Sequence, residues 1–532
     1  MYAFFYKASI QLIPLLVLIT VILIIAGLVL NFERIKKLLP KKKIILVLLI
    51  LILVLGAGLR VFLGPWRNMV YFDEWDYYAA GLAMKSEGQF FLCTNGSIDS
   101  CAEKVSPPHP AGFSFFLALA NIFHKDISTG FFVNFFFSML LILLTFLLVK
   151  RISKNDVAGL AAALLVSTEP LSILVSSIAN NETTSIFFLF LSLFSFYLFK
   201  EYKDNNSLLL FISSILLAIS MKQEFIVLLL LFLSPVILKT IKSRAKAIRK
   251  ISLREIFFLI FSALFLATQI YFILKTKRYG VHESTFSLSH LASNLSFYYS
   301  ALPKVAAILV ALFFLSIVLT LLFRQAKTAF SWINALSVVF LGLYLSYYFN
   351  HTRFFSIVSP LLIAGLSINL CACFHRTSSK SRQKSKLKKN ELKKKISAVL
   401  IILLIGLSGG MILEGAGFLR KYDFTHRAES DLDLLGSLHL EREAVIVSYT
   451  PFLINAVLDR AGFYITSRVD EEVESLLKRN MPVYLYEGVF CKEPNLKAAC
   501  DSLKNNFVFE EIAKGKKIGN YEAIMYRVIR RK

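Results

Sequence analysis

Three carboxylates within four positions form the stretch of this sequence best suited to acid–base chemistry. Asp73, Glu74 and Asp76 lie in the segment YFDEWDYY, residues 71–78. A carboxylate can take the proton from a hydroxyl or amide while that group attacks an electrophilic carbon. We therefore predict Asp73 as a catalytic base and Glu74 as a catalytic neighbour that raises its pKa. If the segment is helical, Asp73, Asp76 and Tyr77 share one face, and Asp76 orients the helix, is solvated or contacts substrate.

Cations far from this stretch in the sequence could stabilise a phosphate as it leaves. Arg353 offers a planar, permanently charged fork for phosphate oxygens, and Lys222 offers a compact point charge. His351 could assist either role. We predict these three residues as a phosphate-binding group. The alternative is that Arg353 and Lys222 are helix-end cations whose charged heads reach water.

Three further polar residues, Glu182, His109 and Glu224, are predicted as weaker substrate contacts. Glu182 could equally cap the start of a helix, because Asn180 and Thr183 flank it. His109 stands between prolines and could simply shape a turn.

A divalent metal site is a minor alternative in this sequence. His282 and Glu283, together with His351 and Asp73, could supply ligands, but no tight ligand spacing supports such a site. We therefore predict no cofactor and do not favour a metal.

The composition indicates the setting in which these residues act. Of 532 residues, 56% are hydrophobic and 49 are Phe. Apolar runs near twenty residues in length recur along the chain and are typical of transmembrane helices. The first run, 8–30, is too long and uniform for a cleaved signal peptide. The sequence predicts a multi-pass membrane protein.

About twelve membrane-spanning helices are expected. Their approximate ranges are 8–30, 44–63, 127–149, 157–178, 184–199, 207–221, 225–239, 255–274, 304–323, 330–349, 354–374 and 396–417. We interpret 1–43 as an extra N-terminal helix with a basic loop, 44–417 as a helical catalytic domain and 418–532 as a separate domain.

The net charge of +25 is concentrated in three loops between these helices. The loops 31–43, 239–254 and 375–395 contain six, seven and ten Lys or Arg residues. Basic loops between spans mark the cytoplasmic side. This distribution favours a topology signal over nucleic-acid binding, and alternation of the spans then places all three basic loops inside.

The same alternation places the unusual polar turns on the external face of the cytoplasmic membrane. The first external loop, 64–126, carries the three carboxylates, and its apolar segment 111–124 is short enough for an interfacial or re-entrant helix. The turns with Glu182, Lys222 and Arg353 follow on the same side. We therefore expect a site built from several distant segments at this face.

The C-terminal domain is predicted to be a small extracytoplasmic α/β domain. Strands are expected at 444–449, 482–486, 507–512 and 523–529, with helices from Pro451 to Gly462, over 471–479 and from Asn495. Strands and helices that alternate at this spacing are typical of an α/β fold.

The six cysteines fit this topology. Cys93 and Cys101 share the first external loop, and Cys491 and Cys500 share the C-terminal domain. Two close pairs on an oxidising face are predicted disulfides. Cys371 and Cys373, near the inner end of a helix, are predicted to be free thiols.

The segment FDEWDYYAAGLAMKSEG resembles the first-loop Asp-Glu motif of the GT-C superfamily of glycosyltransferases, in the group of protein O-mannosyltransferases and lipid A aminoarabinose transferases. The similarity continues in SPPHPAGFSFFLALANIF, SMKQEF and HTRFFSIVSPLLIAGL, and covers most of 44–374. The resemblance implies a membrane helical fold, a polyprenyl-phosphate sugar donor and a first-loop Asp as base. It departs from the family in the extra N-terminal span, and neither a Trp-Trp-Asp motif nor an internal β-trefoil is present.

The predicted function is therefore inverting transfer of a sugar to an extracytoplasmic protein, lipid or glycan, with Asp73 as general base. The alternative is a polytopic transporter or lipid flippase without transferase activity. Transporters place charges near the middle of the membrane and often contain inverted repeats or broken helices. Here the ionisable residues gather at helix ends, which favours the transferase.

Overall fold

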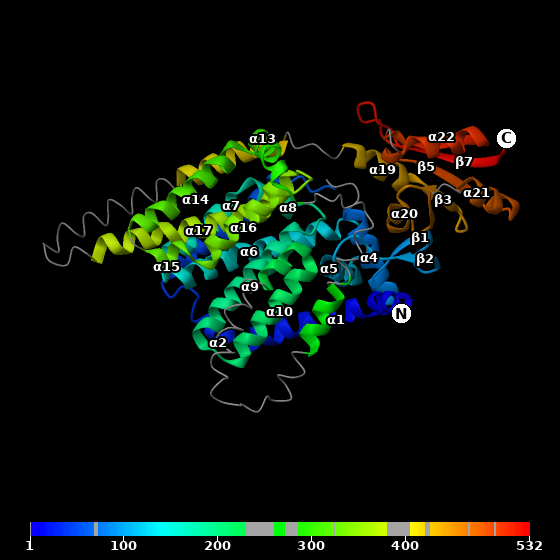
Figure 1. Cartoon of the computed structure of the whole chain (residues 1–532). Helices are drawn as coiled ribbons and strands as arrows, with labels where there is room; N and C mark the ends of the chain where they lie inside the picture. Colours follow the sequence, from blue (N-terminus) through cyan, green and yellow to red (C-terminus); the bar gives the residue numbers. More distant parts are fainter. Residues whose placement is uncertain are drawn as a thin grey trace.

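The computed structural model describes residues 2–68, 73–124, 126–229, 260–269, 271, 286–323, 325–379, 405–420, 426–465, 469–493 and 496–532. A bundle of helices makes up most of this part of the chain, and a mixed α/β region lies beyond one end of the bundle (Figure 1). The first loop of the chain, with α4, β1 and β2, lies between the two (Figure 1).

The elements up to residue 379 are almost all helical. They are α1 (Tyr2–Leu30), α2 (Phe32–Lys36), α3 (Lys43–Leu63), α4 (Asp73–Glu87), β1 (Leu92–Gly96), β2 (Cys101–Val105), α5 (Ala111–Phe123), α6 (Thr129–Ser153), α7 (Asp156–Thr168), α8 (Pro170–Ser176), α9 (Glu182–Tyr202), α10 (Asn205–Met221), η1 (Gln223–Phe225), η3 (Leu288–His290), α13 (Leu291–Ala301), α14 (Lys304–Leu322), α15 (Ala326–Ala329), α16 (Trp332–Ser346) and α17 (Thr352–Ser379). Residues 260–269 and 405–420 are also helical.

Six helices in the described residues are long and apolar enough to cross a membrane. They lie at Ile10–Leu30, Lys43–Leu63, Thr129–Ser153, Glu182–Tyr202, Lys304–Leu322 and Thr352–Cys373. The most apolar stretches of α9 and α17 are 89% and 94% buried, so these two helices form the centre of the bundle. The corresponding stretch of α3 is only 22% buried and exposes Ile, Leu and Val side chains, as expected for a surface that faces lipid.

The predicted multi-pass architecture is confirmed, while the count of twelve spans stays a prediction. Two predicted spans, 207–221 and 330–349, are the shorter apolar helices α10 and α16. The predicted spans 225–239, 255–274 and 396–417 fall partly outside the described residues. The short predicted helix at 111–124 is present as α5.

The predicted span 157–178 is not one straight helix, because α7 and α8 meet at a 62° bend. Proline at the first position of α8 cannot donate a backbone hydrogen bond and ends the preceding helix. Glu169 caps α8 through Ser172 N at 2.5 Å. Fully buried Arg60 of α3 donates from Nη1 to the oxygen of Ser167 at 3.1 Å, so a buried cation satisfies a carbonyl next to the break.

The α/β region contains α19 (His426–Ser437), β3 (Val445–Ser448), α20 (Pro451–Leu458), β4 (Ala461–Tyr464), α21 (Val469–Lys478), β5 (Val483–Glu487), η4 (Val489–Lys492), α22 (Lys497–Asn506), β6 (Phe507–Lys514) and β7 (Ile524–Arg531). Its sheet has seven strands in the order β2-β1-β4-β3-β5-β7-β6. The central strands β4, β3 and β5 are parallel, and the other pairs are antiparallel.

The four strands predicted from the C-terminal sequence are present as β3, β5, β6 and β7. The helix predicted to run from Pro451 to Gly462 ends earlier, at Leu458, because Asp459 adopts a left-handed conformation with φ of 55°. The residues that follow it form β4 instead, a strand that the sequence did not predict. Asn495, the predicted start of the next helix, lies outside the described residues.

Two of the seven strands come from the first loop rather than from the C-terminal region. Strand β1 pairs with β4 through Asn95 opposite Phe463 and Gly96 opposite Gly462. The sheet therefore includes residues from two distant parts of the chain. The predicted C-terminal domain, which begins at 418, does not contain the whole sheet.

Candidate active site

Asp73 is the first residue of α4, and two basic side chains from other segments bind its carboxylate. Arg353 Nη1 at the start of α17 lies 2.5 Å from Oδ2. His109 Nε2, just before α5, lies 3.1 Å from Oδ1. The two contacts span 280 and 36 positions of sequence, so the fold brings together residues that the sequence keeps apart.

A second group of charges adjoins the first. Glu182, at the first turn of α9, is 1% exposed, and Lys222 Nζ lies 3.4 Å from its Oε1. The Nε atom of Arg353 is 3.8 Å from the same oxygen, so Arg353 lies between Asp73 and Glu182. The ring of Phe354 lies 5.2 Å from both Lys222 Nζ and the Arg353 guanidinium carbon, within the range of a cation–π contact.

Asp76 and Tyr77 lie on the same side of α4 as Asp73, as the helical spacing predicted. Asp76 Oδ2 is 3.9 Å from His109 Nε2, and the ring of Tyr77 lies 4.9 Å from the His109 ring. Asp76 is only 5% exposed, so the interpretation of Asp76 as a solvated residue is wrong. His109 contacts both Asp73 and Asp76 and does more than shape a proline turn.

The two aspartates have opposite shifts in pKa. Burial favours the protonated form of Asp73, but the charges of Arg353 and His109 outweigh it and hold the pKa of Asp73 well below its usual range. Burial raises the pKa of Asp76 to about 8; His109 opposes this rise and Asp73 adds to it. The expectation that Glu74 raises the pKa of Asp73 is therefore wrong, because an arginine rather than a carboxylate dominates the charge around Asp73.

Glu74 itself is 1% exposed. It follows Asp73 by one residue and therefore lies about 100° around the helix from it. Within α4, the carboxylate that joins Asp73 beside His109 is thus Asp76, at helical spacing.

His351 and Glu224 occupy more peripheral positions. His351 Nδ1 accepts a hydrogen bond from the backbone N of Arg353 at 3.2 Å, so it caps the start of α17. Burial, followed by the charge of Arg353, lowers the pKa of His351 to about 3, which leaves the ring neutral. Glu224 lies in the turn η1, is partly exposed and contributes to the raised pKa of Tyr77, after burial and Asp73.

Several buried polar atoms around the cluster lack a hydrogen-bond partner among the described residues. They are Asp76 Oδ1, Asn180 Nδ2, Glu182 Oε2, Thr183 Oγ1, Gln223 Nε2, Tyr344 OH and Arg353 Nε. Buried polar groups in native proteins are nearly always satisfied, so such a concentration is typical of a site that takes a polar ligand.

Asparagines hold the turn that carries Glu182. Asn181 Nδ2 donates to the oxygen of Met221 at 2.7 Å, which ties this turn to the end of α10 beside Lys222. Asn134, near the start of apolar α6, donates from Nδ2 to the oxygen of Ile178 at 2.6 Å, and its Oδ1 accepts from Thr184 at 2.9 Å. The sequence reasoning missed Asn134, although an amide within an apolar span is itself a signal of a specific contact.

The chain was compared with protein families, with curated proteins and with solved structures. The family model for dolichyl-phosphate-mannose-protein mannosyltransferases matches residues 108–266. No curated protein sequence matches the chain. The apo structure of ArnT from Cupriavidus metallidurans matches with a TM-score of 0.54 and 11% identity, over 90% of this chain and 97% of ArnT.

Two further structures agree. ArnT from the same organism bound to undecaprenyl phosphate has a TM-score of 0.54 and 9% identity, over 92% of this chain and 98% of that one. The apo oligosaccharyltransferase of Archaeoglobus fulgidus has a TM-score of 0.51 and 11% identity, over 88% of this chain and 73% of that one. This chain has a GT-C fold. The predicted resemblance to the mannosyltransferase and aminoarabinose transferase group is thereby confirmed.

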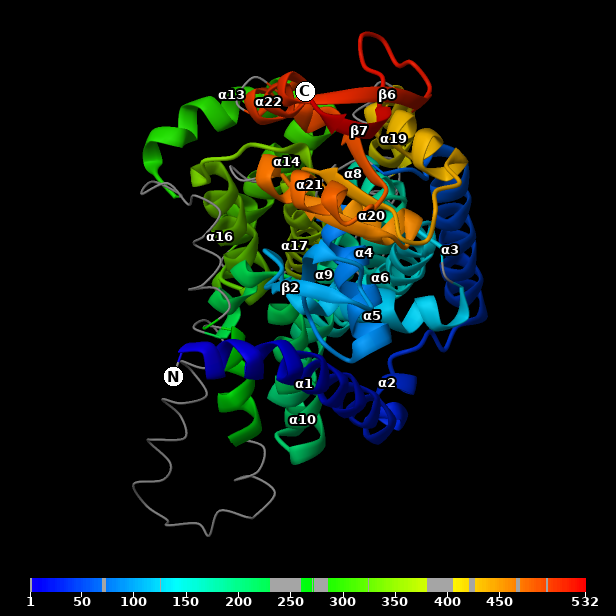
Figure 2. The ribbon, with the colours of Figure 1, turned by 90° about the vertical axis from the view of Figure 1, so that its right-hand side faces the viewer.

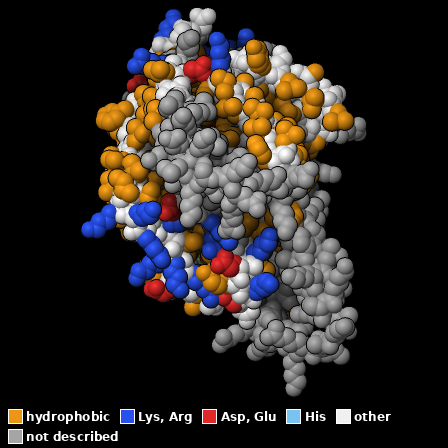
Figure 3. Space-filling view, turned by 90° about the vertical axis from the view of Figure 1, so that its left-hand side faces the viewer, with side chains coloured by type: hydrophobic (Ala, Val, Ile, Leu, Met, Phe, Trp, Pro, Cys, Tyr) orange, Lys and Arg blue, Asp and Glu red, His pale blue; other side chains and the backbone are white. Residues whose placement is uncertain are grey.

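Within this GT-C fold, the charged cluster lies at one end of the helical bundle. It is built from the starts of α4, α9 and α17 and the end of α10. The other end of α9, 21 residues away, is about 30 Å distant at the rise of an α-helix. The ion pairs there are Arg34 with Asp204 at 2.6 Å, Lys150 with Asp156 at 2.6 Å and Arg151 with Glu201. Figure 3 shows Lys and Arg side chains gathered in the lower part of the face seen from the left of Figure 1, next to a broad hydrophobic area.

The two predicted disulfides and the two predicted free thiols are present in the structure. Cys93 is bonded to Cys101, and Cys491 is bonded to Cys500. Cys371 and Cys373 are free and buried in α17.

No group of three or more His, Cys, Asp or Glu side chains suited to a metal ion occurs in the described part of the chain. His282 and Glu283, the candidate ligands from the sequence, lie outside the described residues.

Proposed function

We propose that this protein is an inverting membrane glycosyltransferase that moves a sugar from a polyprenyl-phosphate-linked donor to an acceptor. The acceptor is an extracytoplasmic protein, lipid or glycan. The donor class is supported by the matching family, named for dolichyl-phosphate-mannose, and by the ArnT structure that contains undecaprenyl phosphate. The observation that carries the proposal is the contact of Asp73 with Arg353 at 2.5 Å, which joins a base and a phosphate-binding cation in one site.

Asp73 is the proposed general base. It takes the proton from the hydroxyl or amide of the acceptor while the acceptor atom bonds to the anomeric carbon. The bond between that carbon and the phosphate oxygen breaks, and its electron pair stays on the phosphate. The products are the glycosylated acceptor and a polyprenyl phosphate, and attack from the side opposite the phosphate inverts the anomeric carbon.

Arg353 and Lys222 are the proposed phosphate-binding residues. Both are buried, at 12% and 8% side-chain exposure, where a cation interacts with an anion more strongly than in water. Both are bound by carboxylates, Asp73 and Glu182, in the described structure. These carboxylate oxygens occupy the positions that phosphate oxygens of a donor would take.

This arrangement gives Asp73 a way to become a stronger base when the donor binds. While Arg353 holds Oδ2, the pKa of Asp73 is low and it is a weak base. A donor phosphate competes for the same guanidinium. As Arg353 turns to the phosphate, the stabilisation of ionised Asp73 falls, its pKa rises and Oδ2 becomes available to the acceptor proton. His109 keeps Oδ1 in place through its 3.1 Å contact.

The proposed orientation follows the charge rule. The helix ends with Lys150, Arg151 and Lys200 face the cytoplasm together with the basic loops, and the charged cluster opens to the other side of the membrane. The α/β region, which adjoins the cluster through α4, is then extracytoplasmic as well. In this assignment 1–43 is an additional N-terminal segment, 44–417 is catalytic, and 418–532 together with the first loop covers the site.

One observation favours the second candidate function, a transporter or flippase. The 62° bend between α7 and α8 is a broken helix of the kind that transporters use to line a substrate path. Against it, the charged cluster is at the ends of α9, α10 and α17 and not near their middles.

The test is a product assay with purified protein in liposomes that contain undecaprenyl-phosphate sugars. A transferase converts the donor to undecaprenyl phosphate plus a glycosylated acceptor, whereas a flippase moves the intact donor between leaflets. The acceptor is supplied as an envelope extract, and the new glycan is identified by mass spectrometry. Intact donor that only changes leaflet, with no free undecaprenyl phosphate, would favour the transporter.

A further inference from the structure

Helix α4 is buried on two sides, and only one of them is the charged cluster. Residues 73 and 75 of a helix lie about 200° apart, so Trp75 points away from Asp73. Trp75 is 1% exposed. The other buried members of its hydrophobic cluster all belong to the α/β region, and they are Leu434, Leu435, Ala444, Ile446, Leu453, Ile454, Tyr484, Tyr486, Val489, Tyr521, Ala523 and Met525.

Trp75 packs on one particular face of the sheet. Side chains alternate between the two faces of a strand, and here Ile446 and Tyr484 belong to the cluster with Trp75. Val447 and Leu485, their neighbours in the chain, belong to a second cluster with α21 and α22. Helix α20 contacts α4 (Figure 2), and its Leu453 and Ile454 belong to the cluster with Trp75.

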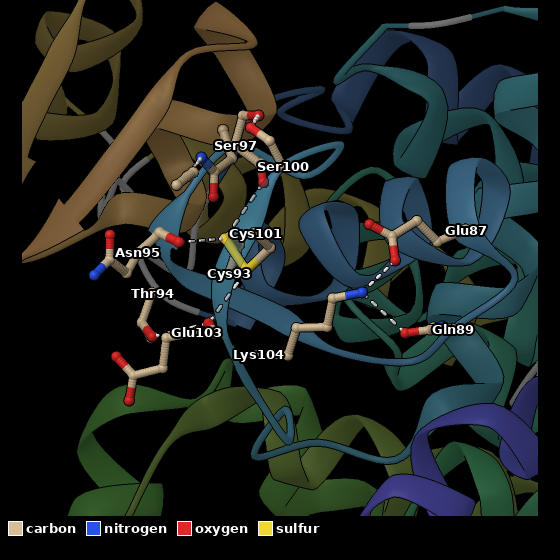
Figure 4. Close-up of a disulfide and its surroundings, with 12 residues drawn as sticks. Glu87, Gln89, Cys93, Thr94, Asn95, Ser97, Ser100, Cys101, Glu103 and Lys104 are labelled. Atoms are coloured by element: carbon tan, nitrogen blue, oxygen red, sulfur yellow. Dashed lines mark hydrogen bonds and ion pairs between the residues drawn. A yellow bond between two sulfur atoms is a disulfide. The ribbon is translucent and has the colours of Figure 1, made fainter.

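The far end of α4 is tied to the same sheet by the hairpin of β1 and β2. Lys104 of β2 donates to Glu87, the last residue of α4, and to Gln89 Oε1 at 3.0 Å (Figure 4). The disulfide between Cys93 and Cys101 closes the hairpin.

The hairpin is in turn fixed to the α/β region. Its β1 pairs with β4, and Asn455 Nδ2 of α20 donates to the oxygen of Gly96 at 2.9 Å. Ahead of α4, Arg67 Nη1 lies 3.0 Å from Glu429 Oε1 of α19. The packing of Trp75, the hairpin and the Arg67–Glu429 pair therefore link the helix that begins with Asp73 to the α/β region.

We propose that the α/β region positions the helix that carries the base, with Trp75 as the main positioning residue. The sheet and its hairpin fix the axis of α4, and this fixes how closely Asp73 approaches Arg353 and the reacting carbon. This inference rests on the proposed function for the part that concerns turnover. A displacement of about 1 Å from the reacting geometry can cost on the order of 100-fold in rate. The face of the α/β region that packs on Trp75 then acts on turnover through α4, whereas the opposite face, with Leu503, serves stability only.

The test compares Trp75→Ala with two control variants, Trp75→Phe and Leu503→Ala. Trp75→Phe keeps an aromatic ring, and the indole N–H that it removes has no hydrogen-bond partner among the described residues. Leu503→Ala truncates a fully buried side chain in the cluster on the opposite face of the sheet. Sugar transfer is measured as kcat and donor KM, and the thermal midpoint of each variant is recorded.

We expect Trp75→Ala to lower kcat about 10- to 100-fold while donor KM stays within about twofold, because Arg353 and Lys222 are untouched. Trp75→Phe should restore most of kcat. Leu503→Ala should lower the thermal midpoint as much as Trp75→Ala does and leave kcat near the wild-type value. Equal loss of kcat in Leu503→Ala would overturn the positioning role, because general instability would then explain both.

A second readout does not depend on the reaction. Amide hydrogen exchange across 73–87 should be faster in Trp75→Ala and unchanged in Leu503→Ala. If the wild type transfers no sugar, the proposed function fails, but faster exchange in α4 still supports the positioning inference. Wild-type exchange in Trp75→Ala overturns it.

A surface variant covers the case in which Trp75→Ala does not fold. Lys104→Ala removes the link to Glu87 and Gln89 and the contact of Lys104 Nζ with the Phe91 ring, from a side chain that is 30% exposed. It should speed exchange at the C-terminal end of α4 and lower kcat a few-fold; no change in either would count against the proposal.

Discussion

Arg353 and Arg34 each bind an aspartate, at opposite ends of the helical bundle and in different surroundings. The Arg353 and Asp73 side chains are 12% and 17% exposed, and a second buried pair, Glu182 with Lys222, adjoins them. The Arg34 and Asp204 side chains are 27% and 33% exposed. An exposed pair contributes little and needs no further partner, whereas buried charges are costly unless they are matched.

The difference teaches which charges of a membrane protein carry function. Charges at the basic end form partly exposed ion pairs, such as Arg34 with Asp204 and Lys150 with Asp156. Charges at the other end are desolvated, shared among four segments and surrounded by polar atoms that lack partners in the described residues. A ligand with oxygen atoms would complete that set, and the predictions below test this contrast.

The largest expected effect is that of Asp73→Asn compared with Asp204→Asn. Loss of the general base should lower kcat by a factor on the order of 10³, as for other general-base removals. The variant should fold, because Arg353 keeps Glu182 as a partner. Asp204→Asn, which weakens the exposed pair and the cap of α10, should leave kcat within about twofold. Measured sugar transfer at the wild-type rate by Asp73→Asn would remove Asp73 as the base.

Next in size is Arg353→Ala, with Arg34→Ala as its control. Removal of the guanidinium should lower kcat/KM for the donor about 100-fold, because both ground-state binding and the leaving phosphate lose a cation. Arg353→Lys should recover only part of this, since an ammonium cannot bind two oxygens as a planar fork does. Titration of undecaprenyl phosphate as product inhibitor gives the affinity directly. If its affinity is the same in Arg353→Ala, Arg353 does not bind the phosphate.

A third prediction uses the raised pKa of Asp76. The pKa of folded Asp76 is about 8, because burial outweighs His109 and Asp73 adds to the rise, whereas an unfolded Asp titrates near ~3.9. Between these two values the native state holds one proton that the unfolded chain lacks, so stability falls as pH rises. The raised pKa of His109 acts in the same direction, and Asp73, with its lowered pKa, titrates below this window.

The thermal midpoint should therefore fall as pH rises from 5 to 8, and more gently in Asp76→Asn. A difference of one bound proton between the native and unfolded states changes the free energy of unfolding by at most about 1.4 kcal/mol per pH unit. The measurement is thermal unfolding of both proteins in detergent at several pH values. An identical slope in the two proteins would mean that Asp76 is already ionised at neutral pH.

The smallest expected effect is that of Lys150→Ala at the basic end. Lys150 pairs with Asp156 at 2.6 Å, and its loss should change the free energy of unfolding by no more than about 1 kcal/mol and leave turnover unchanged. A large loss of activity would mean that the basic end also takes part in the reaction, and the contrast between the two ends would no longer hold.

The sequence was informative about the cluster because topology and charge constrain it together. Once the basic loops fix one side, the turns with Asp73, Glu182, Lys222 and Arg353 must share the other side, and the structure does bring them together. Which cation binds which carboxylate could not be predicted. That choice depends on side-chain reach at the level of 1 Å, and the resulting pairing with Arg353 reversed the expected shift in the pKa of Asp73.

The sheet was predictable only in its local parts. Strand patterns that alternate with helix patterns along the chain identified β3, β5, β6 and β7, and the closeness of Cys93 and Cys101 in one loop predicted their disulfide. The pairing of β1 with β4 joins residues such as Asn95 and Phe463, and nothing in a local window describes such a contact. Pro170 marked the break in the predicted span 157–178, but the pattern of apolar residues concealed it.

The pairing of β1 with β4 also has a consequence for folding during biosynthesis, because the two strands are synthesised at very different times. A ribosome makes the hairpin hundreds of residues before β4, and Asn455 lies 359 positions after Gly96, to which it donates a hydrogen bond. Throughout that delay the outer edge of β1 has no native neighbour and is open to mispairing with other nascent chains. The disulfide between Cys93 and Cys101 joins residues only 8 positions apart and can form early. The oxidised hairpin can therefore fold before β4 is synthesised. Inserted chains should therefore need a thiol oxidase before synthesis ends, and a holdase that covers β1 until its partner emerges.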